Sequence, residues 1–317
     1  VLLMRHWWTG LGVLSIVSVL VLLFSDGCAA STTTIVLGGD VMLGRGVAER
    51  LGGDWPAAFA DVEPLLTGAD VAFVNLESPL TTSPMVRTGC DLRAAPEAVV
   101  ALAAAGFNVV SISNNHAWDA GEAGLRETIR VLCGAGIQPA GDEREAELID
   151  SDVGCDGLVV ESISLLAFDD STASLDVDAA AAAVASAAQG ADPIIVSIHW
   201  GGEFQAEPSP HQRDIAARLA AAGATVVAGH GPHVLQPVEW IGDTLIAYSL
   251  GNLLFDQPYP VDCTWGVLLR LELREKRVVE IEAIPTVTEG GRVCIAPTGW
   301  RMPILHRMGL EATPDVR

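Results

Sequence analysis

The segment Phe107-Asn-Val-Val-Ser-Ile-Ser-Asn-Asn-His-Ala-Trp-Asp119 joins an apolar run to a cluster of polar side chains. The run from Phe107 to Ile112 predicts a buried strand, and the apolar spacing that follows Gly121 predicts a helix. The cluster from Asn114 to Asp119 then lies on a strand-to-helix loop, where open α/β sheets carry their ligand sites. An amide, an imidazole and a carboxylate in such a loop can bind a metal, whereas a hydrogen-bonded histidine in a capped loop is the structural alternative.

Strand-like and helix-like runs alternate on both sides of this segment. We expect strands at 34–37, 71–74, 107–112, 158–168, 193–198 and 225–228. We expect helices at 96–105, 122–133, 177–188 and 210–222, three of them ended by glycine. From Val234 onward the sequence is rich in strand-forming segments, with strands expected at 244–248, 266–273 and 278–284. This composition suggests a second sheet packed on the first. The sequence therefore predicts a layered α/β protein with sheets between helices.

The composition allows a large core and disfavours one class of partner. The chain has 317 residues, of which 50% are hydrophobic and 18% are charged, so a substantial core can be buried. Its 40 acidic residues outnumber its 18 basic ones, and the net charge is −22. Since binding to a nucleic acid backbone depends on basic side chains, we expect no nucleic acid partner. An anionic substrate would need a local cation to hold it.

Residues 1–30 have the composition of an export signal or membrane anchor. Arg5 and His6 precede an apolar stretch at 11–24, and Gly27-Cys28 is followed by small polar residues. Cys28 resembles the lipidated cysteine of bacterial lipoproteins, although Ser25 stands where an aliphatic residue is usual. A lipoprotein, a secreted protein with ordinary cleavage and an uncleaved membrane anchor all remain open. Each places the folded part, residues 31–317, outside the cytoplasm, and we expect it to be attached to the membrane.

Five cysteines follow the N-terminal segment, at positions 90, 133, 155, 263 and 294. An exported protein can keep disulfides, and the odd number leaves at least one cysteine without a partner in the chain. We expect a bridge between Cys263 and Cys294, which flank predicted C-terminal strands. Buried free thiols are the alternative.

Polar side chains follow several of the predicted strands. Asp40 ends the first, Asn75 and Glu77 the second, His199 the strand at 193–198, and His230 with His233 the strand at 225–228. Because the carboxyl ends of parallel strands meet at one edge of a sheet, we expect these residues to share a pocket. Carboxylates, an amide oxygen and imidazoles together suit Mn²⁺, Fe or Zn²⁺, as one ion or a pair.

Six segments in a fixed order carry a family resemblance. They are Gly39-Asp-Val-Met-Leu-Gly-Arg45, Asn75-Leu-Glu-Ser-Pro-Leu80, Asn114-Asn-His-Ala-Trp-Asp119, His199-Trp-Gly-Gly-Glu203, Gly229-His-Gly-Pro-His-Val-Leu-Gln236 and Tyr248-Ser-Leu-Gly-Asn252. Their order and spacing resemble the CapA-type poly-γ-glutamate capsule biosynthesis family, a branch of the calcineurin-like metallophosphoesterase superfamily. The resemblance implies an α/β fold of the metallophosphoesterase type, a four-layer α/β/β/α sandwich whose loops hold a metal centre.

The resemblance also implies roles for individual residues. The metal ligands would be Asp40, Glu77 (or Asn75), Asn115, His199, His230 and His233. His116, oriented by Asp119, would act as general acid, while Arg45 would bind an anionic group and Glu203 would complete the metal shell or contact substrate. Arg45 has the alternative of an ion-paired arginine. Met42 replaces the histidine usual in the first superfamily motif, so either one ion or an asymmetric pair is compatible with the sequence.

Two functions follow from the resemblance, and the sequence leaves both open. One is a metal-dependent hydrolase acting on a phosphoester or a γ-glutamyl amide, in which the metal serves as Lewis acid and His116 assists the leaving group. The other is a non-catalytic component that binds poly-γ-glutamate and helps export or anchor it within a membrane complex for capsule synthesis. Fold alone does not choose between them.

Overall fold

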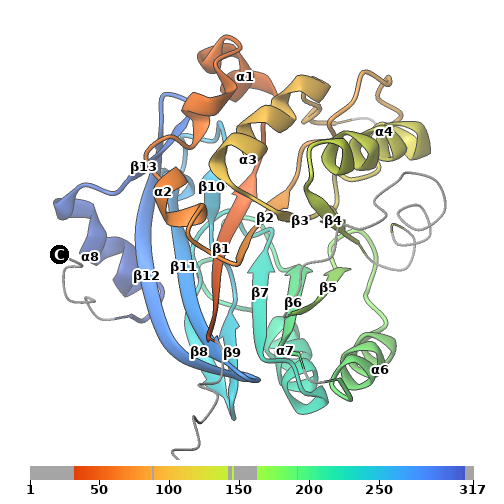
Figure 1. The fold of residues 1–317 in the computed structure, drawn as a ribbon, viewed down its shortest axis with the longest axis vertical. Coiled ribbons are helices and arrows are strands. Elements are labelled where there is room, and N and C mark those ends of the chain that lie inside the picture. Colours follow the sequence, from red (N-terminus) through yellow and green to blue (C-terminus); the bar gives the residue numbers. More distant parts are fainter. Residues whose placement is uncertain (1–31, 88, 142–144, 146–162, 191, 311–317) are drawn as a thin grey trace, which may run out of the picture. The chain divides into compact units, whose positions relative to one another are not determined.

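Two β-sheets face each other at the centre of this computed structural model (Figure 1). The structure describes residues 32–87, 89–141, 145, 163–190 and 192–310. The signal or anchor expected at residues 1–30 lies outside them. Among the described residues, no helix combines the length and the apolar character that crossing a bilayer requires.

The larger sheet has eight strands in the order β13-β12-β11-β1-β2-β3-β4, with β10 also pairing with β1. Strands β1 to β4 are parallel to one another, and β11 runs antiparallel to β1 on its other side. The bounds are β1 (Thr32–Val41), β2 (Val71–Leu76), β3 (Val109–Ser111), β4 (Gln138–Ala140), β10 (Asn252–Leu254), β11 (Trp265–Arg274), β12 (Arg277–Glu289) and β13 (Arg292–Ile295).

The smaller sheet has five strands in the order β5-β6-β7-β9-β8. All its neighbours are parallel except the hairpin of β8 and β9. The bounds are β5 (Ser164–Asp169), β6 (Ile194–His199), β7 (Val226–His230), β8 (Val238–Ile241) and β9 (Thr244–Ala247).

Helices cover the outer face of each sheet (Figure 1). Those on the larger sheet are α1 (Arg45–Leu51), α2 (Glu63–Leu66), α3 (Val99–Ala105) and α4 (Gly121–Gly134), with the short turns η1 (Trp55–Ala58) and η2 (Pro96–Ala98). Those on the smaller sheet are α6 (Val177–Ala187) and α7 (Pro210–Ala222). The turn η3 (Val261–Thr264) precedes β11, and α8 (Thr298–Arg307) follows β13 and adds Ile304 and Leu305 to the core between the sheets.

Alternation along the strands builds three apolar cores and hence four layers. In β1, Val36 faces the helices of the larger sheet, while Ile35 and Leu37 face the smaller sheet. In β7, Val226 contributes to the core between the sheets and Val227 to the core beneath α6 and α7. Successive side chains of a strand point to opposite faces, so each central strand serves two cores. The predicted four-layer α/β/β/α sandwich is therefore confirmed.

Capping residues explain why the predicted helix at 210–222 matches α7 so closely. The Ser209 side chain accepts a hydrogen bond from the backbone N–H of Gln212, and the Gln212 side chain accepts one from the backbone of Ser209. This capping box satisfies backbone donors that a helix start leaves without partners. Gly223 then ends the helix in the left-handed conformation, with φ of 106°.

The expected assignment of the β-rich C-terminal part to a separate sheet is wrong. Strands β8 and β9 join β7 in the smaller sheet, whereas β10 to β13 extend the larger sheet from β1. The reason is that β11 pairs with the exposed edge of β1 over the register Thr32–Leu37, which gives β1 a partner on each side. The expected strand at 158–168 begins at Ser164 within the described residues, and 158–162 lie outside them.

The expected bridge between Cys263 and Cys294 is also wrong, because both are free thiols. Cys263 is buried beside β10 and Cys294 lies half-buried in β13. The alternative of free thiols therefore holds for these two residues. Cys90 is free as well and exposed, whereas Cys133 is disulfide-bonded.

Candidate metal centre

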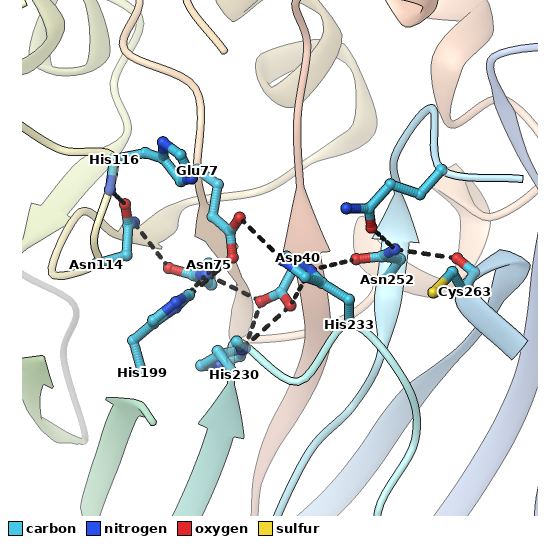
Figure 2. Close-up of polar contacts among 12 residues, drawn as sticks. Asp40, Asn75, Glu77, Asn114, His116, His199, His230, His233, Asn252 and Cys263 are labelled. Atoms are coloured by element: carbon cyan, nitrogen blue, oxygen red, sulfur yellow. Dashed lines mark hydrogen bonds and ion pairs between the residues drawn. The ribbon is translucent and has the colours of Figure 1, made fainter. Parts of the chain in front are cut away.

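Polar side chains from both sheets meet where the carboxyl ends of their strands face each other (Figure 2). Asp40 lies in β1 beside Asn75 of β2, and Glu77 follows β2 directly. In the smaller sheet His199 ends β6 opposite His230, which ends β7. The predicted ligands thus converge from two sheets rather than along one edge. This happens because the sandwich aligns the same ends of the central parallel strands.

The loop after β7 adds a further imidazole in a constrained backbone. Gly231 has φ of 101°, and its backbone N–H donates to Asp40 Oδ2 at 3.2 Å. A Cβ at this position would lie 2.9 Å from Nε2 of His199, so only glycine fits here. His233 has φ of 58°, which is uncommon for a residue other than glycine. The loop therefore holds His233 against the carboxylates at a cost in backbone energy.

One carboxylate pair and one imidazole form the tightest group of potential ligands. Ligand atoms of Asp40, Glu77 and His233 all lie within 4.8 Å of one another, and all three residues are buried. His233 Nδ1 is 3.3 Å from Asp40 Oδ2, and His233 Nε2 is 3.9 Å from Glu77 Oε2. His230 Nδ1 lies 3.4 Å from Asp40 Oδ1, which adds a second imidazole.

Several buried polar atoms have no hydrogen-bond partner among the residues that the structure describes. Glu77 Oε2 and both ring nitrogens of His230 belong to this centre, and Oδ1 of Asn115, on the loop after β3, is another such atom. Buried polar atoms are rarely left unpaired, because desolvation without compensation costs about 1–3 kcal/mol each. A divalent cation would supply the missing partner for carboxylate and imidazole atoms alike. The residues therefore fit a bound metal ion.

The two carboxylates have opposite pKa shifts. Burial raises the pKa of Asp40, but contacts with the imidazoles of His230 and His233 outweigh it, and the net pKa is below the usual range. Burial and the charge of Asp40 raise the pKa of Glu77 well above its usual value. Like charges held this close in a buried site separate their titrations. Without a cation, the site therefore ionises Asp40 more readily than Glu77.

The imidazoles of the site also differ. Burial lowers the pKa of His199 to about 4, despite the opposing charges of Asp40 and Asp169. Burial also lowers the pKa of His233, but the charges of Glu77 and Asp40 outweigh it and raise the value to about 10. His199 is thus neutral at pH 7, while His233 is a cation in the metal-free protein.

Asn75 connects the two sheets through its side-chain amide. Its Nδ2 donates to Asp40 Oδ1 at 2.9 Å and to Glu77 Oε1 at 3.2 Å, and lies 3.3 Å from Nδ1 of His199. Its Oδ1 accepts from Nδ2 of Asn114 at 3.0 Å. The sequence proposed Asn75 as an alternative ligand to Glu77, but both ends of its amide are engaged with protein groups.

His116 and Asp119 lie together on the loop after β3. His116 Nδ1 is 2.7 Å from Asp119 Oδ2, and Asp119 is buried. Arg87 reaches this loop, since its guanidinium donates to the backbone oxygen of Asn115 at 2.6 Å and lies 3.9 Å from Asp119 Oδ1. The carboxylate accepts from Nδ1, which leaves Nε2 of His116 as the ring atom available to a substrate.

The two residues proposed for substrate contact have different surroundings. Arg45 forms a two-point ion pair with Asp256, and Asp256 Oδ2 also accepts from the backbone N–H of Gly46 at 3.1 Å. The ion-paired alternative therefore describes Arg45. Glu203 is exposed. Burial and the charge of Asp40 are the larger causes of the raised pKa of Glu77, and the charge of Glu203 adds to them.

Two residues that hold the site together were not among the residues predicted from the sequence. Asn252 accepts at Oδ1 from His233 Nδ1 at 3.0 Å, and Arg87 restrains the loop of His116. The sequence contained a hint of the role of Asn252, because this residue ends the conspicuous segment Tyr248-Ser-Leu-Gly-Asn252 and follows Gly251, which has a positive φ. The sequence contained no such hint for Arg87, since the loop in which it stands has no distinctive pattern.

Comparison with known proteins links this geometry to a family. Residues 34–257 match the family described as bacterial capsule synthesis protein PGA_cap. The chain is 30% identical over 238 residues to the PGA biosynthesis protein CapA of Bacillus subtilis, covering 69% of this chain and 62% of that protein. It is 29% identical over 285 residues to the capsule biosynthesis protein CapA of Bacillus anthracis, covering 81% and 68% respectively.

A solved structure shares the fold at low sequence identity. A phosphatase from Mycoplasma pneumoniae superposes with a TM-score of 0.53 at 12% identity, over 81% of this chain and 94% of that one. This likeness concerns the arrangement of sheets and helices.

Proposed function

This chain belongs to the PGA_cap family of bacterial capsule synthesis proteins, and from that membership we propose that it is a metal-dependent hydrolase acting on poly-γ-glutamate during capsule synthesis. The observation that carries the proposal is the buried group of Asp40, Glu77 and His233. A structural role alone does not account for two buried carboxylates beside a histidine with both ring nitrogens unpaired, His230. A catalytic metal site does.

Asp40, Glu77, His230 and His233 would hold a divalent ion, and Asn115, whose Oδ1 is buried without a partner among the described residues, would be the further ligand that the sequence predicts. Once bound, the ion supplies Lewis-acid chemistry, since it acidifies water and polarises an electrophile. The buried side chains exclude bulk water from the ligand atoms, which strengthens every electrostatic interaction within the site.

His116 supplies the proton that a hydrolysis needs at the leaving group. The Asp119 carboxylate accepts from Nδ1, so the Nε2 face of a protonated imidazole can donate to a leaving amine or alkoxide. Asp119 stabilises that protonated form and fixes the ring orientation, and Arg87 restrains Asp119. His116 is part-exposed, as a residue that meets substrate must be.

The charge distribution of the protein is compatible with an anionic substrate that binds at a single local cation. The net charge of −22 repels a polyanion from the surface in general. Arg87 is the cation beside the His116 loop, and its side chain is 40% exposed. It can receive a substrate carboxylate, as an arginine fork does. An arginine binds a carboxylate and a phosphate alike, so we favour a γ-glutamyl amide bearing a free carboxylate over a phosphoester because the relatives are named for PGA or capsule biosynthesis.

We further propose that the protein works outside the cytoplasm, tethered to the membrane by its N-terminal segment and associated with the machinery of capsule synthesis or export. Support comes from the apolar stretch at 11–24 and from Cys28. The two Bacillus relatives are named for capsule or PGA biosynthesis. The chain spans 62% of the length of the first, so the role of the whole relative is transferred here only as a proposal.

The test measures turnover and binding on the same preparation. The 317-residue chain in mild detergent is stripped of metal, reloaded with Mn²⁺ and incubated with poly-γ-glutamate and, separately, with p-nitrophenyl phosphate. Shortening of the polymer that disappears in the His233→Ala variant supports the proposal. Cleavage of the phosphate ester alone would reassign the protein to phosphoesterases. Polymer binding without cleavage of either compound would overturn the hydrolase and leave a polymer-anchoring component.

A further inference from the structure

Asn75 stands between ligand atoms that would otherwise surround a cation (Figure 2). Its NH₂ group contacts Asp40 Oδ1, Glu77 Oε1 and His199 Nδ1, at 2.9, 3.2 and 3.3 Å. Two carboxylate oxygens and an imidazole nitrogen are a typical ligand set for a transition metal. Here the two protons of one amide serve all three acceptors.

The orientation of this amide follows from two backbone groups. Asn114 Nδ2 donates to the carbonyl oxygen of Leu76 at 2.9 Å, and Asn114 Oδ1 accepts from the N–H of His116 at 3.1 Å. A carbonyl can only accept and a backbone N–H can only donate, so the Asn114 amide has one allowed orientation. Its Nδ2 also faces Asn75, which must therefore present Oδ1 to it at 3.0 Å. Nδ2 of Asn75 then points at the carboxylates, and it cannot ligate a metal.

As a consequence, the two oxygens of each carboxylate, Asp40 and Glu77, face different partners. One oxygen of each, Asp40 Oδ1 and Glu77 Oε1, accepts from Asn75. The other two oxygens face His233, with Asp40 Oδ2 at 3.3 Å from Nδ1 and Glu77 Oε2 at 3.9 Å from Nε2. Within the described part of the chain, Glu77 Oε2 has no hydrogen-bond partner.

We propose that the Asn75 amide takes the place of one cation, so that this centre binds a single divalent ion on the Asp40, Glu77 and His233 side. His199 Nδ1 then accepts from Asn75 and serves to position it. The inference rests on the proposed metal site, and it specifies how many ions that site takes. An aspartate at position 75 would put an anionic oxygen where the NH₂ group lies and so create a second set of ligands.

The test counts ions without using activity. The metal-free chain in detergent is titrated with Mn²⁺ by calorimetry, and bound manganese is measured after gel filtration and by electron paramagnetic resonance. The variants are Asn75→Asp and the matched control Asn108→Asp. Asn108 precedes β3 at the end opposite Asn114, and its amide bonds only backbone groups of Ala72 and Asp70, so its substitution adds the same charge away from the centre.

We expect one ion in the wild type with an isolated-manganese spectrum, two ions in Asn75→Asp with a spin-coupled spectrum, and one in Asn108→Asp. Two ions in the wild type would overturn the inference while leaving the metal-dependent function intact. One ion in a folded Asn75→Asp would also overturn it. If Asn75→Asp does not fold, the wild-type count and spectrum decide the question alone. No bound ion in the wild type would overturn the proposed function as well.

Discussion

Nδ1 of His233 lies 3.0 Å from Oδ1 of Asn252, and this contact determines which ring nitrogen can bind a metal. The Asn252 amide is oriented by the carbonyl oxygen of Cys263, which accepts from Nδ2 at 3.0 Å. Asn252 therefore presents its oxygen to His233, and Nδ1 must carry a proton. In the neutral imidazole, Nε2 then holds the lone pair, on the side of Glu77.

Replacing Asn252 by alanine should weaken Mn²⁺ binding by about 10–100-fold, as loss of a residue that orients a metal-binding histidine generally does. Calorimetric titration of the metal-free protein measures the effect. Gln257→Ala is the matched control, because it removes another partner of the Asn252 amide and leaves the contact with His233 in place. An equal loss of affinity in both variants would argue that general loosening, not the histidine tautomer, is responsible.

Replacing His230 by leucine should abolish the rise in melting temperature that Mn²⁺ produces, and the metal-free variant should be less stable than the wild type. Leucine removes the imidazole as a ligand, and it also removes the 3.4 Å contact of His230 Nδ1 with the buried carboxylate of Asp40. Thermal unfolding with and without Mn²⁺ measures both effects. His306→Leu, at an exposed position of α8, should retain the full metal response. A retained response in His230→Leu would exclude His230 as a ligand.

The layers of the fold could be predicted because apolar alternation and helix stops are local signals. The segments at 210–222 and 177–188 became α7 and α6 almost without change. Strand pairing is not local, since it depends on which edge remains free once the other elements have packed. The hairpin of β8 and β9 and the pair β11 and β12 have similar apolar runs, yet they join different sheets.

The same distinction applies to the centre. Each predicted ligand stood at the end of a strand or in the loop that follows it, and this local position was visible in the sequence. The partners that orient them come from distant segments, such as Asn252 beside His233 and Asp256, which pairs with Arg45 across 211 positions. Whether Arg45 binds substrate or an aspartate could not be read from its neighbours in the chain.

Replacing His116 by alanine should lower kcat for the hydrolysis by about 10²–10⁴-fold with Mn²⁺ content unchanged, because general acid catalysis contributes about that factor. Asp119→Asn should produce a smaller loss of kcat, since the amide oxygen still accepts from Nδ1 but no longer carries the charge that stabilises the protonated ring. Steady-state kinetics and metal analysis on the same samples separate chemistry from binding. A rise in KM alone would instead assign this pair to substrate binding.

Mn²⁺ binding at pH 7 should release at least one proton. In the metal-free protein the pKa of His233 is raised to about 10, because the charges of Glu77 and Asp40 outweigh the effect of burial. The raised pKa means that protonated His233 stabilises the metal-free fold below its unfolded pKa, and that this contribution is lost as pH rises through about 10. An imidazole must lose its extra proton before it can bind a metal, so apparent affinity should increase with pH by about tenfold per unit for each proton released.

Calorimetry in two buffers with different enthalpies of ionisation counts the released protons directly. Identical binding enthalpies in HEPES and Tris at pH 7 would show that no proton leaves. That result would contradict the assignment of a charged His233 in the metal-free site. His233→Ala is not a suitable control, since it removes the ligand itself. The control is His306→Leu, which replaces an exposed histidine away from the site.

Gly39→Ala should lower the free energy of unfolding by about 3 kcal/mol, at the upper end of the usual cost of overpacking. A Cβ at Gly39 would lie 1.9 Å from the backbone oxygen of Gly251, the atom that accepts from the N–H of Asp40 at 2.9 Å. Strands β1 and β10 would have to separate beside the metal ligands. Gly134→Ala is the matched control, because it stands in helix α4 with nothing within 4 Å and should gain up to about 1 kcal/mol. Urea unfolding of both variants measures the difference, and a Gly39→Ala midpoint equal to that of the wild type would show that the close approach of Gly39 and Gly251 is absent in solution.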